Sequence, residues 1–191
     1  QKHDQFMPSV AAGPDGTVYF VSTAQILYAF TRDGRRKWTF APGGNPTGAP
    51  AVGWDGTLCV GFGSTLYSLT PNGTARWQYS ASSPLGAGGP AIGADGTIYF
   101  GASDERVYAL SATGSNKWSY AANFRVNAPP ALDTNGNIYV GLDSGSIQVL
   151  NPQGIRLWGY STLRSLESSA IIGADGTVYV SSDRLYALTA A

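Results

Sequence analysis

Few of the side chains that carry out enzyme chemistry occur in this chain of 191 residues. His3 is its only histidine and Cys59 its only cysteine. A Ser–His–Asp triad, a thiolate zinc site and a disulfide framework are therefore not expected. The sequence also contains no G-x-x-x-x-G-K-[ST] phosphate-binding loop. We therefore predict no catalytic residues, no metal ligands and no cofactor.

Aspartates that each precede a glycine recur along the chain, at Asp15, Asp55, Asp95 and Asp175, with Asn135 in the matching place of a further segment. Such carboxylates could bind calcium, and residues 133–137 (DTNGN) begin like an EF-hand loop. The string lacks that loop's glycine at the sixth place and its final glutamate. Asp-Gly and Asn-Gly favour tight two-residue hairpin turns for backbone reasons alone. We therefore predict turns at these positions.

A repeat of forty residues explains this spacing. The turn glycines stand at Gly16, Gly56, Gly96, Gly136 and Gly176, and a tryptophan column runs through Trp38, Trp77, Trp118 and Trp158. In the third repeat, the pattern predicts short strands near residues 90–93, 97–101, 107–111 and 118–120. Four-stranded units at this period are typical of a β-propeller.

The strand segments are apolar on both faces, which suits blades that are covered on each side by their neighbours. We predict an all-β fold, a five-bladed propeller in a single domain over residues 1–191, with repeats near 8–47, 48–87, 88–127, 128–167 and 168–191. The last repeat has no fifth tryptophan, so its blade should lack the outer strand. Residues 184–189 would then form an exposed edge strand through which the chain could self-associate. A fragment of a longer propeller is the alternative.

Positions that differ between repeats are the better guide to function, because rigid scaffolds carry binding residues on variable loops. The loops after the second strands and the connectors after the fourth strands differ most, and they should share one rim. Their candidate ligand-binding residues are Asp104, Glu105, Arg106, Phe124, Arg125, Asp143, Arg164, Asp183 and Arg184. Ordinary solvated loops are the alternative for these charges. Trp54 is a further candidate, since the repeat has Pro14, Ala94, Thr134 and Ala174 in its place.

Composition excludes several classes of partner. Twelve Lys and Arg balance twelve Asp and Glu, so no attraction to nucleic acid or to an anionic membrane is expected. The longest uncharged stretch, 77–94, is interrupted by Pro, Gly and Ser and is no membrane span. A protein, a peptide or a carbohydrate remains as the predicted ligand.

The unit from Pro90 to Tyr120, PAIGADGTIYFGASDERVYALSATGSNKWSY, resembles the pyrroloquinoline-quinone (PQQ)-type repeat. The pieces D-G-T-x-Y, Y-A-L and G-x-x-x-W occur in that family's order, and the resemblance extends over five repeats. It implies a β-propeller in which each outer-strand tryptophan docks onto the neighbouring blade. Members of the family include PQQ-dependent quinoprotein dehydrogenases and non-catalytic BamB-type outer-membrane assembly scaffolds. The adjacent cysteine pair of the dehydrogenases has no counterpart in this sequence.

Three hypotheses follow from these observations. The first is a non-catalytic propeller that binds or scaffolds through its variable rim, in the extracytoplasmic location that the resemblance implies. The second is a fragment of a PQQ-dependent quinoprotein dehydrogenase, which rests on the resemblance alone. The third is an engineered or recently amplified repeat propeller with no ligand, since the third and fifth repeats still share GADGT and YAL.

Overall fold

The computed structural model describes residues 6–162, 164–166 and 168–189. These residues form nineteen strands, which are arranged in five antiparallel sheets. No helix occurs within these ranges. The strands of each sheet follow one another in chain order, and each sheet is called a blade below. The all-β architecture with one blade per repeat, predicted from the sequence, is confirmed.

Blade one contains β1 (Phe6–Ala12), β2 (Val18–Ser22), β3 (Leu27–Phe30) and β4 (Arg36–Phe40), and blade two contains β5 (Ala51–Val52), β6 (Leu58–Phe62), β7 (Thr65–Leu69) and β8 (Ala75–Ser80). Blade three contains β9 (Ala91–Ile92), β10 (Ile98–Gly101), β11 (Arg106–Leu110) and β12 (Asn116–Ala121). Blade four contains β13 (Ala131–Leu132), β14 (Ile138–Gly141), β15 (Ser146–Leu150) and β16 (Arg156–Ser161). Blade five contains β17 (Ile171–Ile172), β18 (Val178–Ser181) and β19 (Leu185–Leu188).

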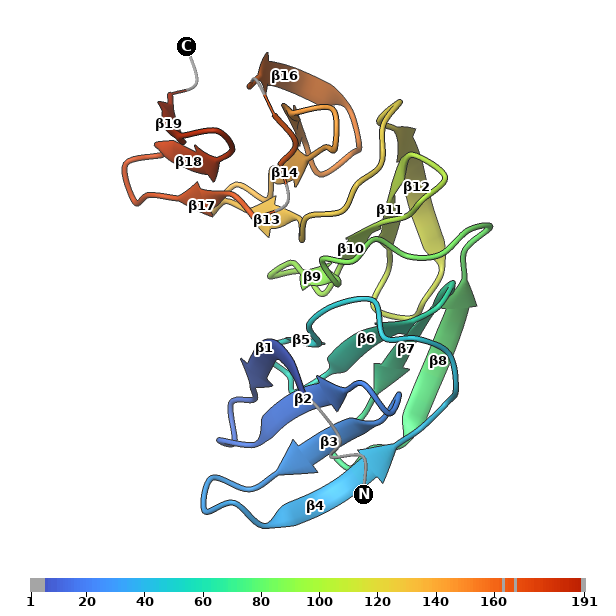
Figure 1. Cartoon of the computed structure of the whole chain (residues 1–191). Helices are drawn as coiled ribbons and strands as arrows, with labels where there is room; N and C mark the ends of the chain where they lie inside the picture. Colours follow the sequence, from blue (N-terminus) through green and yellow to red (C-terminus); the bar gives the residue numbers. More distant parts are fainter. Residues whose placement is uncertain (1–5, 163, 167, 190–191) are drawn as a thin grey trace.

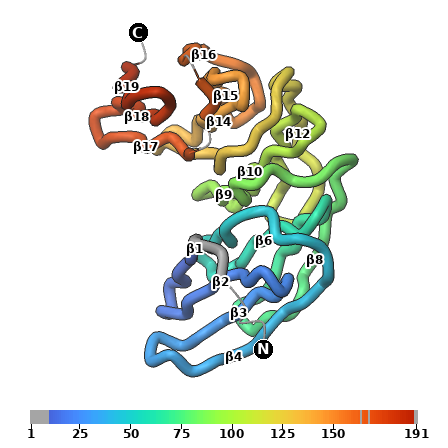
Figure 2. The backbone as a smooth tube through the Cα atoms, in the orientation of Figure 1, coloured from blue at the N-terminus to red at the C-terminus, as the bar shows by residue number. Residues whose placement is uncertain are grey.

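The blades stand one after another along an open arc (Figure 1). The first strands of the blades lie on the inside of the arc, where β1 contacts β5, β5 contacts β9, and β13 contacts β17. The fourth strands, β4, β8, β12 and β16, lie on the outside. Figure 2 shows blades one and five as the two separated ends of the arc.

The turns between first and second strands differ from the predicted two-residue form. In blade three, the N–H of Gly93 donates to the carbonyl of Thr97 at 2.8 Å, and the N–H of Gly96 donates to the carbonyl of Gly93 at 2.9 Å. These bonds close a three-residue loop, 94–96. Only the glycine takes a positive φ, 77° at Gly96. Asp95 contributes through its carboxylate, which accepts hydrogen bonds from the backbone N–H and the hydroxyl of Thr97 at 3.0 and 2.7 Å.

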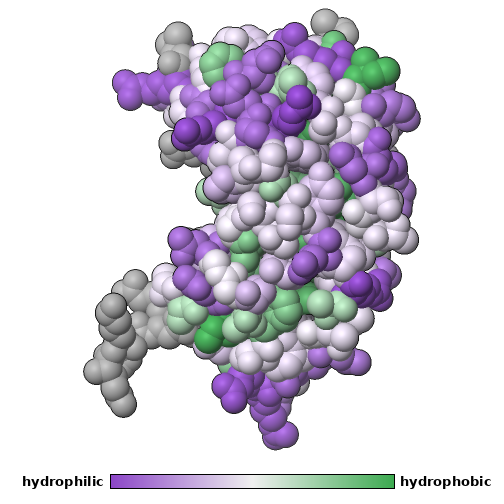
Figure 3. Space-filling model, turned by 90° about the vertical axis from the view of Figure 1, so that its right-hand side faces the viewer, coloured by the Kyte–Doolittle hydropathy of each residue, from purple (hydrophilic) through white to green (hydrophobic). Residues whose placement is uncertain are grey.

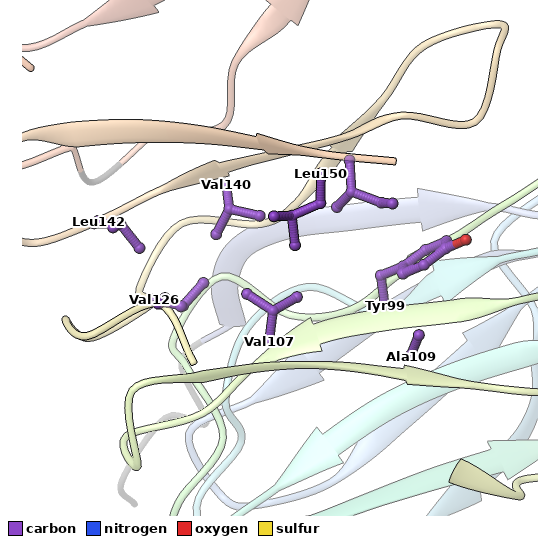
Figure 4. Close-up of a cluster of buried hydrophobic side chains, with 9 residues drawn as sticks. Tyr99, Val107, Ala109, Val126, Val140, Leu142 and Leu150 are labelled. Atoms are coloured by element: carbon purple, nitrogen blue, oxygen red, sulfur yellow. The ribbon is translucent and has the colours of Figure 1, made fainter. Parts of the chain in front are cut away.

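Strands that are apolar on both faces are also buried on both faces. All four residues of β10 and all four of β14 are buried. Side chains of neighbouring blades meet between the sheets, as where Tyr99 and Val107 of blade three face Val140 and Leu150 of blade four (Figure 4). The core therefore consists of separate clusters between consecutive blades, and each blade depends on its neighbours for burial.

The outer-strand tryptophans dock onto the following blade. The indole N–H donates to a turn carbonyl at 2.8–2.9 Å in three pairs, Trp38 to Pro71, Trp77 to Ala112 and Trp118 to Pro152. Each indole lies against a turn glycine, where an added Cβ would stand 2.6–2.7 Å from the ring: Gly73, Gly114 and Gly154. The docking role that the resemblance implied is thus confirmed for three tryptophans. The turn that Trp158 would contact lies outside the described residues.

Blade five has three strands in the described part of the chain, as predicted, and β19 is its outermost. Its face turned away from blade four is open, with Ile171 70% exposed and Leu185 69% exposed. Tyr179 on the same face is 37% exposed, whereas Tyr139, its counterpart in blade four, is 6% exposed. Burial that the other blades receive from a fourth strand and a following blade is therefore missing here.

Candidate functional site

One rim of the arc is built from the connectors between blades and the loops after the second strands. This loop rim comprises connectors 41–50, 81–90, 122–130 and the described residues of the last connector (162, 164–166 and 168–170), together with loops 23–26, 63–64, 102–105, 142–145 and 182–184. Backbone hydrogen bonds join a connector to the loops on either side of it. In connector 122–130, the N–H of Ala122 donates to the carbonyl of Glu105 at 2.8 Å, and the carbonyl of Arg125 accepts from the N–H of Asp143 at 3.1 Å. Backbone hydrogen bonds therefore hold the connectors and loops of this rim in fixed positions relative to one another.

Four of the predicted binding residues meet where this connector crosses from blade three to blade four. Glu105 and Asp143 belong to the loops that the connector is bonded to, and Phe124 and Arg125 belong to the connector. The Phe124 side chain is 48% exposed, Glu105 and Arg125 are exposed, and Asp143 is half-buried. These four residues are called the Phe124 patch below. It presents an aromatic ring with acidic and basic groups around it.

Three further predicted residues lie together at the blade-five end of the rim. The hydroxyl of Ser182 donates to the carbonyl of Arg164 at 2.7 Å, which joins the last connector to the last loop. Next to it, Arg184 Nε lies 3.4 Å from Asp183 Oδ2, and the Arg184 guanidinium lies 5.3 Å from the centre of the Tyr186 ring. The hydrogen bond from the Tyr186 hydroxyl, ahead of the positive charges of Arg184 and Arg164, lowers the pKa of Asp183.

Two aspartates predicted as ligand-binding residues hold their own loops in place. Asp104 Oδ2 accepts hydrogen bonds from the Ser82 hydroxyl at 2.7 Å and from the Tyr108 hydroxyl at 2.5 Å. Asp183 accepts from the Tyr186 hydroxyl at 2.9 Å. Burial and the bond to Asp104 raise the pKa of Tyr108, so this hydroxyl keeps its proton and donates it. A tyrosine three or four residues after a loop aspartate was the sequence signal for this role.

Arg106 also has a partner within its own blade, since its guanidinium Nη1 donates to the hydroxyl of Ser119 at 3.2 Å. In the Phe124 patch, the side chains of Glu105, Phe124 and Arg125 are exposed, and no hydrogen bond or ion pair of their side chains is found among the described residues. Figure 3 shows one face of the molecule, on which hydrophilic and neutral residues predominate and hydrophobic residues gather in separate areas.

Trp54 is not close to the other candidates. It lies in the turn between β5 and β6, on the opposite rim, which is formed by the hairpin turns and is called the turn rim below. Its side chain is 89% exposed and borders a shallow pocket of about 230 Å³ lined by the turns of blades one and two. A larger pocket of about 380 Å³ lies between the matching turns of blades three and four and includes Asp95, Tyr99 and Asp133. The predicted set therefore divides between two rims.

The turn rim carries a hydrogen-bond network that the sequence reasoning missed. Asp15 Oδ2 accepts from the Thr17 hydroxyl at 2.7 Å and from Lys37 Nζ at 3.1 Å. The Thr17 hydrogen bonds, followed by Lys37, lower the pKa of Asp15 from 3.8 to about 2. Blades two and three repeat the arrangement with Asp55 and Arg76 at 3.9 Å and with Asp95 and Lys117 at 3.6 Å. The available signal was a Lys or Arg directly before each of the first three column tryptophans.

In blade four, the turn between the first and second strands is stabilised by a different set of hydrogen bonds. Leu157 stands where the other blades have the cation, and Asp133 stands where they have a glycine. Asp133 Oδ1 accepts from the backbone N–H groups of Asn135 and Asn137, both at 2.8 Å, and Oδ2 accepts from the Tyr139 hydroxyl at 3.2 Å. Burial and the charge of Asp133 raise the pKa of Tyr139 to about 12. The DTNGN string thus forms an internally bonded turn.

Two comparisons with known proteins found similarity to these repeats. Residues 8–88, which are the first two repeats, match the family model described as outer membrane protein assembly factor BamB. A solved structure, BamB from Moraxella catarrhalis, superposes with a TM-score of 0.82 over 98% of this chain, at 21% sequence identity. The first two repeats are thus similar to the repeats of that family model, and the structural likeness shows that the whole chain shares the propeller fold. The chain spans 60% of the length of that BamB chain. A comparison with curated proteins gave no match.

The likeness to PQQ-type repeats raises the question of a quinone cofactor with calcium, and the described residues do not fit one. In residues 6–162, 164–166 and 168–189, no three His, Cys, Asp or Glu side chains lie close enough together to hold a metal ion. Cys59 is fully buried, and burial raises the pKa of its thiol to about 12. We therefore assign no chemical step to a quinone.

The described part of the chain also contains no helix that is long and apolar enough to cross a membrane.

Proposed function

We propose that this chain is a non-catalytic binding or scaffold module that holds a partner protein through its loop rim. The Phe124 patch is the observation that carries the proposal. A half-exposed aromatic ring beside an arginine is the composition that protein–protein contacts favour at their centres. Glu105 and Asp143 on either side supply opposite charge, which sets the orientation of a bound partner more than the strength of binding.

The loops that surround the patch are held in place before binding. Ala122 and Asp143 bond their backbones to the neighbouring segments, and Asp104 is bonded to Ser82 and Tyr108. A surface that is already ordered loses little conformational entropy on association. These contacts support a role in presenting a fixed surface, which is what a scaffold does.

The relatives support the same reading. The matching family model is described as an assembly factor for outer membrane proteins, and the similar solved structure is a BamB. We infer from them that the partner is a protein and that the location is extracytoplasmic, since outer membranes lie outside the cytoplasm. A carbohydrate is the alternative ligand, for which the exposed ring of Trp54 on the turn rim would be the natural contact.

Site-specific photo-crosslinking in the native source tests the proposal. A photoreactive phenylalanine analogue at position 124 should crosslink one defined protein, and the same analogue at position 54 on the opposite rim should not. Arg125→Glu, introduced beside the crosslinker, should reduce the yield because it reverses one charge of the patch. Equal crosslinking from both rims, or full yield with Arg125→Glu, would contradict the proposed site.

Two further measurements address the other readings. Binding to a glycan array that disappears in Trp54→Ala would identify a carbohydrate ligand instead. Turnover of an alcohol or sugar by the purified chain would contradict the non-catalytic role.

A further inference from the structure

The pocket of about 380 Å³ on the turn rim lies between blades three and four, which are both four-stranded. Ile92 of β9 and Leu132 of β13 are among its lining residues. In the described residues, β1 contacts β5, β5 contacts β9 and β13 contacts β17, but no contact of that extent joins β9 to β13. The volume falls in the range of small-molecule sites, about 300–1,000 Å³. The Phe124 patch is on the opposite rim, so the inference does not rest on the proposed function.

A carboxylate of this pocket, that of Asp133, takes the place that the turn aspartate has in other blades. In blade one, a Cβ added at Gly13 would stand 3.0 Å from Asp15 Oδ1. Asp133 is the residue of blade four that matches Gly13, so its side chain points to the same place. Its Oδ1 accepts from the backbone N–H of Asn137 at 2.8 Å, and its Oδ2 accepts from the Asn137 side-chain amide at 2.7 Å. Asp15 accepts in the same way from the backbone N–H and the hydroxyl of Thr17.

Blade four does not supply the cation that accompanies this carboxylate elsewhere. In blades one to three, a fourth-strand cation lies 3.1–3.9 Å from the turn aspartate: Lys37, Arg76 and Lys117. The matching residue of blade four is Leu157, which is 51% exposed. No ion pair of the described residues includes Asp133. The cause is a leucine within a complete fourth strand, β16, so the pocket has a carboxylate whose charge no neighbouring side chain balances.

The rest of the lining indicates which kind of cation fits. Asp95 also lines the pocket, but Lys117 Nζ lies 3.6 Å from its Oδ2. Ile92, Leu132 and Pro152 contribute apolar surface. A metal ion would prefer oxygen ligands to such walls. An organic cation can satisfy both parts of the lining, because its charge pairs with the carboxylate and its carbon stem removes the apolar walls from water.

We propose that the pocket between blades three and four binds an alkylammonium group. The charged nitrogen lies beside Asp133 and supplies the cation that Leu157 does not. The carbon stem lies against Ile92 and Leu132. Such a group occurs on free organic amines and on the lysine side chains of proteins, and the experiments below distinguish the two sources.

Titration of the full chain with hexylammonium, followed by ¹H–¹⁵N NMR, tests the proposal. The amide signals of Asp95, Asn135 and Gly136 should shift and saturate. Hexanol, which has the stem without the charge, should bind about three- to fivefold more weakly, the range of a partly exposed ion pair. Ethylammonium, which has the charge with a short stem, should bind at least about tenfold more weakly. Equal binding of hexanol and hexylammonium, or shifts confined to residues outside the pocket, would overturn the proposal.

Two pairs of matched variants test the role of the carboxylate. Leu157→Lys restores the cation of the other blades at an exposed position and should weaken hexylammonium binding about three- to fivefold, whereas Leu157→Gln should leave it unchanged. Asp133→Asn should weaken binding to a similar degree, and Asp15→Asn, the same change in a turn outside the pocket, should not. Equal binding by Leu157→Lys and Leu157→Gln would overturn the proposal even if Asp133→Asn failed to fold.

A lysine derivative identifies the source of the group. Nα-acetyl-lysine methylamide presents the ammonium as a peptide chain does. Its binding with the same pattern of shifts as hexylammonium would support a protein side chain as the occupant. Binding of hexylammonium without binding of the lysine derivative would support a free amine. Binding of neither compound would overturn the proposal.

Discussion

Each aspartate of the turn rim acts through its carboxylate rather than through its backbone. Asp15 accepts hydrogen bonds from the backbone N–H and the hydroxyl of Thr17, and Lys37 from the fourth strand completes the set. One side chain thereby joins the first, second and fourth strands of a blade. The ionised carboxylate is the form that this arrangement stabilises.

Replacing Asp15 by asparagine should make stability less dependent on pH. The folded-state pKa of Asp15 is lowered from 3.8 to about 2, so its contribution is present above pH 3.8 and is lost as the pH falls toward 2. Because the group is exposed, we expect Asp15→Asn to reduce the free energy of unfolding by about 1 kcal/mol at neutral pH. Urea denaturation at neutral pH and near pH 2 measures the difference, most of which should be lost at the lower pH.

Asp33→Asn is the control for this prediction. Its carboxylate pairs with Arg35 at 3.1 Å, and both side chains are well exposed. The change should stay within about 0.5 kcal/mol at either pH. A loss at Asp15 that is equally large at both pH values would show that charge is not the cause.

The sequence predicted the turns, but it did not predict the hydrogen-bond network between the turn aspartates and the cations of the fourth strands. An Asp-Gly pair predicts a hairpin, and the glycines do take positive φ values, such as 77° at Gly96. The three-residue form depends on the hydrogen-bond register between two strands, which a dipeptide does not specify. The link to Lys37 joins residues about twenty positions apart and depends on how far β4 extends along the blade. Residue types alone therefore indicated the turn but not its partner.

Among the elements, the turn before the fourth strand has two roles in blades two, three and four. Its glycine takes a positive φ, and its bare backbone receives the tryptophan of the preceding blade. Gly114 has a φ of 84°, and a Cβ there would stand 2.6 Å from Trp77. Gly34 has the same φ of 84°, but a Cβ there would meet nothing within 4 Å. The two glycines therefore separate the conformational role from the packing role.

Gly114→Ala should destabilise the protein more than Gly34→Ala. Both substitutions carry the cost of a positive φ, about 1 kcal/mol. Gly114→Ala adds the displacement of the Trp77 indole, at about 1–3 kcal/mol for overpacking. Urea unfolding of the two variants side by side gives the comparison. Equal losses would mean that the indole moves aside without cost.

For the candidate binding residues, the order of the strands predicted which rim each residue lies on, but not which residues are neighbours there. The repeat placed the loops and connectors on one rim, and the structure agrees with that placement. Which residues meet there depends on backbone bonds between a connector and the loops of two blades, such as Asp143 to Arg125. These bonds have no sequence signature, because backbone groups make them. The division between the Phe124 patch and Trp54 follows in contrast from strand order alone.

At the scale of the whole molecule, we expect the open face of blade five to limit the stability of the polypeptide 1–191. A segment copied from Gly114–Tyr120 and fused after residue 191 should pair with β19 and cover Tyr179 and Leu185. Burial of apolar surface contributes about 25 cal/mol for each Å². The melting temperature should rise by about 2–4 °C for each kcal/mol gained. Calorimetry of the fusion against the parent measures this, and light scattering shows whether edge-mediated association decreases.

A fusion with Trp replaced by Ala in the added segment is the matched control. It should give less of the gain, because the indole is the largest apolar group that the segment adds. An unchanged melting temperature for the intact fusion, with a monomeric parent, would mean that the edge is covered in another way.

Because the blades form an open arc, they should unfold in a defined order. Blades one and five have a neighbour on one side only, whereas blades two to four are held on both sides. In such a linear array, melting starts at the termini and halts at the boundary between two units. Blade five, which has three strands in the described residues, should unfold first, so amides of β18 should exchange with solvent faster than those of β10 or β14. Partial proteolysis under mild denaturing conditions should accordingly release fragments in steps of one repeat, leaving the middle of the arc until last.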